Sequence, residues 1–131
     1  MKKLIVLVAV IMGSVGAHAS IEKVEKEYQD CLQKVEANLD MRGCSLQAYT
    51  SADEELNLEY KKLQKRIFEG DSAEVKSRLV DAQRAWIQFR DKECSLMGTE
   101  MLGGSGENTI IAGCLADKTI QRTKDLREMF K

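Results

Sequence analysis

Residues 83–94 have the sequence QRAWIQFRDKEC, which contains the only tryptophan of the chain. Gln83, Trp86 and Arg90 follow one another at i, i+3 and i+7, so on a helix they share one face. A tryptophan between a long amide and a guanidinium indicates a buried polar cluster rather than a purely apolar contact. The stretch therefore predicts a helix that carries polar groups on its inner face.

Apolar residues recur every three or four positions in four segments, which is the pattern of amphipathic helices. The segments run over 21–35, 49–67, 75–89 and 111–129, and the last is weaker in its middle. The chain has no proline, and breaks are expected near 37–40, at 70–71 and at 103–106. Short connections make consecutive helices antiparallel neighbours. We therefore expect an all-α fold, a small antiparallel bundle of four helices.

Residues typical of helix ends occupy these breaks. Gly70 is a predicted helix stop, and Asp71 is a predicted cap for the next helix, with Glu74 three residues later. Ser105 is the predicted cap of the last helix, with Glu107 favourably placed in its first turn.

The second helical segment carries a polar face of its own. Asp53, Asn57 and Tyr60 lie at i, i+4 and i+7. Counting from the turn at 70–71, Asp53 comes level with Arg90, which predicts a buried ion pair. The complete predicted network is Asp53, Asn57, Tyr60, Gln83, Trp86 and Arg90. A ligand or catalytic site is one interpretation, and a structural network that fixes the helix alignment is the preferred one, because Arg90 neutralises the single acid.

Residues 1–19 have the features of an export signal. Lys2 and Lys3 precede an apolar run over 4–12, and Ala17-His18-Ala19 forms an A-x-A cleavage site. The run is too short for a membrane span, and no cysteine lies near the cleavage site. We therefore expect a signal peptide at 1–19 and a single soluble domain at 20–131 in the periplasm or outside the cell, with no membrane contact after signal removal.

The charge of the mature chain excludes one class of partner. Without Lys2 and Lys3, 18 basic residues remain against 21 acidic ones, a net charge of −3 over 112 residues. Nucleic-acid binding needs clustered Lys and Arg, so no nucleic acid is expected. The length suffices for one core.

The four cysteines of an exported chain predict two disulfides. Residues equally far from the turn of a helical hairpin lie at the same level, which pairs Cys31 with Cys44 and Cys94 with Cys114. Zinc is the rival interpretation, but the spacings lack a close cysteine pair and the mature chain has no histidine. No metal and no cofactor are expected.

Taken together, these motifs resemble those of the lysozyme inhibitor LprI family. The resemblance runs from about Cys31 to Leu126 and implies a small exported helical protein with paired cysteines. It is carried by the following residues: Cys31, Met41-x-x-Cys44, Asp53-x-x-Leu56-Asn57-x-x-Tyr60, Gln83-Arg84-Ala85-Trp86-x-x-Phe89-Arg90-Asp91-x-x-Cys94, Gly103-Gly104-Ser105 and Cys114-Leu115-x-x-x-Thr119-x-x-Arg122.

The resemblance favours a protein that binds and blocks a lysozyme-type, peptidoglycan-cleaving glycosidase. Such an inhibitor needs a protruding element that enters the cleft of the enzyme. The candidate partner-binding loop is Gly103, Gly104, Ser105, Glu107 and Asn108, with the Cys94–Cys114 bridge holding it in place. The alternative interpretation of this loop is a plain helix connection.

Two other functions compete with inhibition. A periplasmic adaptor without inhibitory activity would bind a protein partner through an acidic helix face, formed by Glu22, Glu25, Glu36 and Asp40 or by Asp53, Glu54 and Glu55. An enzyme is not expected, because the mature chain has no histidine and its cysteines are predicted to be oxidised.

Overall fold

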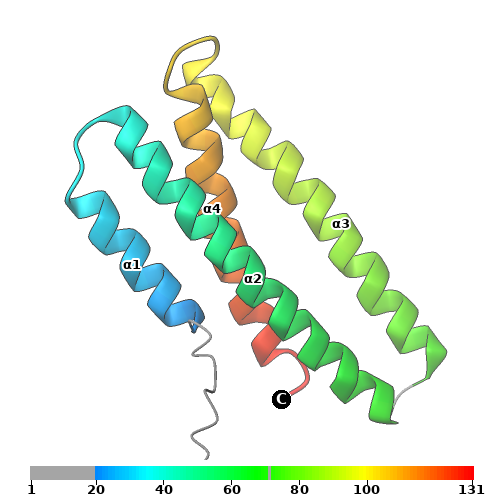
Figure 1. Ribbon diagram of the computed structural model, residues 1–131. Coiled ribbons are helices and arrows are strands. Elements are labelled where there is room, and N and C mark those ends of the chain that lie inside the picture. Colours follow the sequence, from blue (N-terminus) through cyan, green and yellow to red (C-terminus); the bar gives the residue numbers. More distant parts are fainter. Residues whose placement is uncertain (1–19, 71) are drawn as a thin grey trace, which may run out of the picture.

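The computed structural model describes residues 20–70 and 72–131, and helices dominate this part of the chain. The helices are α1 (Ile21–Gln33), α2 (Asn38–Gly70), α3 (Ala73–Gly98), the short 3₁₀ helix η1 (Thr99–Met101) and α4 (Glu107–Glu128). The α-helices run antiparallel to their sequence neighbours (Figure 1), so the expected all-α bundle of four helices is confirmed. The predicted signal peptide lies outside the described residues.

Helix α4 occupies the centre of the bundle. It packs against α1, α2 and α3, most extensively against α2, whereas α2 and α3 contact each other little. The residues at the α2–α4 contact are small, and Ala52, Ala116, Thr119 and Thr123 are fully buried. The Thr123 hydroxyl donates to the Thr119 carbonyl at 2.8 Å, which satisfies a polar group inside the bundle. Short side chains at this contact let the two helices approach closely.

The apolar core has two parts along the axis of the bundle. Helix α1 has 13 residues against 33 in α2, so it covers only part of α2 (Figure 1). The core beneath α1 consists of Ile21, Val24, Tyr28, Cys44, Ala48, Ala52, Ala116 and Ile120. The second part, toward the α2–α3 connection, consists of Leu56, Leu63, Ile67, Leu79 and Leu126.

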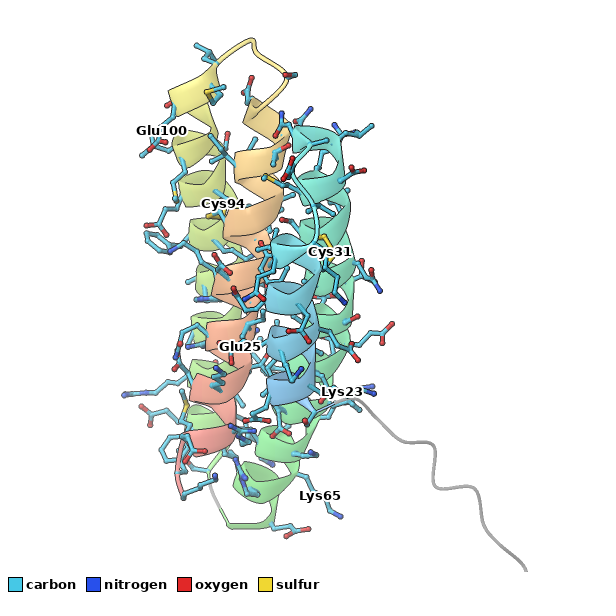
Figure 2. All side chains as sticks on the ribbon, turned by 90° about the vertical axis from the view of Figure 1, so that its left-hand side faces the viewer. Lys23, Glu25, Cys31, Lys65, Cys94 and Glu100 are labelled. Atoms are coloured by element: carbon cyan, nitrogen blue, oxygen red, sulfur yellow. A yellow bond between two sulfur atoms is a disulfide. The ribbon has the colours of Figure 1, made fainter. Side chains whose placement is uncertain are left out.

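Both predicted disulfides are present. Cys31 and Cys44 have their Cα atoms 5.8 Å apart and join α1 to α2, and Cys94 and Cys114 have theirs 5.4 Å apart and join α3 to α4. Figure 2 labels Cys31 and Cys94 toward the end of the bundle that carries the α1–α2 and α3–α4 connections. Each bridge therefore fixes one hairpin near that end.

The helix ends agree in part with the predictions. α2 ends at Gly70 as predicted, and Ser72 occupies the N-cap position of α3, while the predicted cap, Asp71, lies outside the described residues. Within residues 20–70 and 72–131, no helix has the length and apolar content that crossing a membrane requires.

Candidate functional site

The α3–α4 loop forms one tip of the molecule (Figure 1). Gly103 has φ +73°, a conformation that favours glycine, and its N–H donates to the Glu107 carboxylate at 3.0 Å. The Gly104 N–H donates to the Met101 carbonyl at 2.8 Å. Leu102 is 73% exposed at the edge of the turn. These bonds give the loop a defined shape and present an apolar side chain beside it.

The prediction that Ser105 caps α4 is wrong. Gly106 occupies the N-cap position, and the Glu107 side chain reaches back to the loop instead. Ser105 is exposed, and neither its hydroxyl nor the Asn108 amide makes a hydrogen bond within the described part of the chain. Both groups are therefore available to a partner, whereas Glu107 braces the turn.

The loop continues into a surface groove that the sequence did not reveal. A hollow of about 360 Å³ is lined by Asn38, Leu39, Arg42, Ser105, Asn108 and Thr109. A second, of about 290 Å³, shares Arg42 and Asn108 and is otherwise lined by Leu46, Ile111, Ala112 and Leu115. Arg42 is half-buried and has no ion-pair partner among residues 20–70 and 72–131. We call Arg42, Ser105, Asn108 and Leu39 the loop-end surface.

The position of Arg42 beside the α3–α4 loop follows from the topology of the predicted bundle. In an antiparallel bundle the first and third connections lie at the same end, so the start of α2 must approach the α3–α4 loop. The Thr109 hydroxyl, which donates to the Asn38 carbonyl at 3.3 Å, joins these two segments.

The polar network around Arg90 exists, but its partners differ from those predicted. Arg90 is 5% exposed, and its guanidinium binds the Asp91 carboxylate at 2.8 Å and donates to the Thr119 hydroxyl at 3.3 Å. The guanidinium carbon lies 5.3 Å from the ring centre of Tyr49 and 5.1 Å from that of Trp86. Arg90 is thus held by one charge, one hydroxyl and two aromatic rings.

The predicted Asp53–Arg90 ion pair is therefore wrong. Gln83 accepts a hydrogen bond from Arg122 of α4 at 3.0 Å. The physical reason is that α3 packs more extensively against α4 than against α2, so Gln83 and Arg90 find hydrogen-bond partners on α4. Helix α2 contributes the Tyr49 ring beside Arg90. Burial lowers the pKa of Arg122, whose guanidinium also lies over the Trp86 ring.

The residues of the predicted network nevertheless lie at similar positions along the axis of the bundle. A groove of about 420 Å³ runs between α2 and α3, and five of the six predicted network residues line it, Trp86 being the exception. Its lining is Asp53, Leu56, Asn57, Tyr60 and Gln64 on α2 and Val80, Gln83, Arg84, Ile87 and Arg90 on α3. We call it the α2–α3 groove.

The first predicted acidic face is partly used within the molecule. Glu22 binds Arg127 and Glu25 binds Lys124, each at 2.6 Å, so these two acids hold α1 against α4. The hydrogen bond from Arg127 lowers the pKa of Glu22. This use leaves Glu36 and Asp40 as the members of that face without an ion-pair partner among residues 20–70 and 72–131.

The described residues do not form a cluster of metal-ligating side chains. All four cysteines are in disulfides, and no group of three or more His, Cys, Asp or Glu side chains in residues 20–70 and 72–131 is placed to hold an ion.

Comparison with known proteins gives a family match and one relative. A family model described as "Lysozyme inhibitor LprI" matches residues 29–126. An uncharacterised protein of Rhizobium meliloti (strain 1021), R02472, is 38% identical over 111 residues, which cover 78% of this chain and 79% of the relative. No solved structure matches the chain.

Proposed function

The chain belongs to the lysozyme inhibitor LprI family, and we propose that it is an exported protein that binds and blocks a peptidoglycan-cleaving glycosidase of the lysozyme type. The family match over residues 29–126 is the observation that carries this proposal. Two disulfides support an oxidising compartment, either the periplasm or the extracellular space. The protein would act by occupying the cleft of its partner rather than by chemistry of its own.

We place the contact at the loop-end surface. Lysozyme-type enzymes cleave with two carboxyl groups that flank the scissile bond. Arg42, the Ser105 hydroxyl and the Asn108 amide are donors without a partner in the part of the chain that the structure describes, and donors of this kind bind carboxylates well. The exposed Leu39 and Leu102 would contact the apolar parts of the cleft. Gly103 and Gly104 form the turn, and Glu107 holds it.

Preorganisation supports the same location. The Cys94–Cys114 bridge and the Gly103–Glu107 hydrogen bond fix the loop before any partner arrives, which lowers the ordering cost of binding. The net charge of −3 for residues 20–131 would speed the encounter with a basic glycosidase.

A lysis assay tests the proposal. The purified, oxidised protein is mixed with lysozymes of several types, and the clearing of a bacterial cell-wall suspension is followed. We expect a saturable slowing of lysis by at least one type. Lysis that proceeds at full rate for every type at large molar excess contradicts inhibition, and binding without slowing favours the adaptor.

Matched variants locate the surface. Arg42→Gln and Asn108→Ala should each weaken inhibition about tenfold or more if these groups meet enzyme carboxylates. Lys65→Gln is the control, because it removes the same charge at the other end of the bundle (Figure 2). Equal inhibition by Arg42→Gln and Lys65→Gln would remove the loop-end surface from the proposal.

A further inference from the structure

We propose that the α2–α3 groove is a binding site for a short peptide with free ends, about three residues long. The groove holds about 420 Å³, within the usual range of about 300–1,000 Å³ for small-ligand sites. It is separate from the loop-end surface, with which it shares no lining residue. The inference therefore stands independently of the proposed inhibition.

The walls of the groove carry polar groups that the fold does not use. The side chains of Asp53, Asn57, Tyr60, Gln64 and Arg84 make no hydrogen bond or ion pair among residues 20–70 and 72–131. Gln83 and Arg90, which also line the groove, are by contrast held by Arg122 and by Asp91 and Thr119. The unpartnered groups thus face the same space, and the partnered groups form a rigid support beside them.

The unpartnered charges have opposite signs on the two walls. Asp53 on α2 is half-buried, and Arg84 on α3 is exposed. The charge of Arg90 is already neutralised by Asp91, so Arg84 is the available cation. A ligand that satisfies both walls carries an ammonium group at one end and a carboxylate at the other, as a free peptide does.

The offset between these charges sets the length of the ligand. Asp53 lies about six residues further from the α2–α3 connection than Arg84 does, which is about 9 Å along the helix axis. An extended peptide spans about 3.3–3.6 Å per residue, so three residues reach about 10 Å. A single amino acid is too short to contact both groups.

The remaining lining residues suit an extended backbone. Asn57 lies between the levels of the two charges and Tyr60 lies close to the level of Arg84, and their side chains offer both donors and acceptors to peptide N–H and C=O groups. Leu56, Val80 and Ile87 supply apolar contact for side chains. The ammonium would bind Asp53 and the carboxylate would bind Arg84.

Calorimetric titration with tri-alanine tests this inference. We expect saturable binding to the wild-type protein, loss of about tenfold or more in affinity after N-acetylation of the peptide, and a similar loss after C-amidation. The Asp53→Asn variant should bind the N-acetylated peptide as tightly as it binds the free peptide. The Arg84→Gln variant should likewise bind the C-amidated peptide as tightly as it binds the free peptide. Glu54→Gln and Arg78→Gln are the controls and should bind like the wild type.

Each other outcome overturns the inference. Absence of saturable binding at millimolar concentrations rejects the site, as does equal binding of free and capped peptides. If a capped peptide with Lys and Glu side chains binds and tri-alanine does not, the groove recognises a segment inside a protein chain instead. Amide chemical shifts distinguish these cases from binding elsewhere, because only residues of α2 and α3 beside the groove should move.

Discussion

Replacement of Arg90 by methionine tests the central polar network most directly. Methionine keeps the apolar stem and removes the guanidinium. The change loses two cation–π contacts of about 1 kcal/mol each, to Tyr49 and Trp86. It also loses a hydrogen bond to Thr119 of about 1 kcal/mol. The Asp91 carboxylate is 54% exposed, so its ion pair adds about 1 kcal/mol at most and the freed acid returns to water.

The loss of a buried charge partly offsets the destabilisation expected for Arg90→Met. Arg90 is 5% exposed, and removal of its charge recovers part of the desolvation penalty, about 1–2 kcal/mol. The net destabilisation is therefore about 2 kcal/mol. Removing one partner of a fully buried ion pair would cost more, about 3–5 kcal/mol, because the other charge would stay buried without a partner. In a chain of this size the midpoint of thermal unfolding should fall by about 8 °C.

Urea unfolding followed by far-ultraviolet circular dichroism measures the free energy directly. Asp53→Asn is the matched control, and it should change the stability by less than about 0.5 kcal/mol, because Asp53 has no partner among the residues that the structure describes. Double-mutant cycles should show coupling between Arg90 and Thr119 but none between Arg90 and Asp53. A wild-type-like Arg90→Met variant, or coupling confined to Asp53, would falsify the network as described.

Three further changes have expected outcomes. Replacing Cys94 and Cys114 together by serine should reduce the free energy of unfolding by about 3 kcal/mol in urea titrations, since the bridge closes a loop with a sequence separation of 20. Gly103→Ala should cost about 1 kcal/mol in thermal unfolding because of its φ of +73°, and a neutral result would contradict the turn geometry. Arg127 lowers the pKa of Glu22 below the ordinary 4.5, so the stability it contributes is present above that value and is lost as the pH falls through the lowered pKa. Wild-type protein should therefore be more stable than Glu22→Gln at neutral pH, and the two unfolding curves should converge in acid.

The helices and the disulfides were predictable because both depend on spacing along the chain. The apolar stripes gave four helices, and counting from the turns paired Cys31 with Cys44 and Cys94 with Cys114. The same counting brought Asp53 and Arg90 to one groove. The first break, expected near 37–40, lies where α2 begins at Asn38.

The partners of Arg90 were not predictable by counting. Counting gives the level of a residue along the bundle, but not which helix lies beside it. The weak middle of the fourth stripe was the available signal, because Ala116, Thr119 and Thr123 are small where α4 meets α2. Arg42 was missed for a related reason, since its position depends on which connections share an end of the bundle.

The central position of α4 has a consequence for biosynthesis. Since α4 follows α1, α2 and α3 along the chain, a nascent chain that stops before Glu107 lacks the helix against which α2 and α3 pack most extensively. Such a chain also lacks Cys114, so it cannot close its second bridge. The bundle therefore takes its final shape only after α4 has been synthesised.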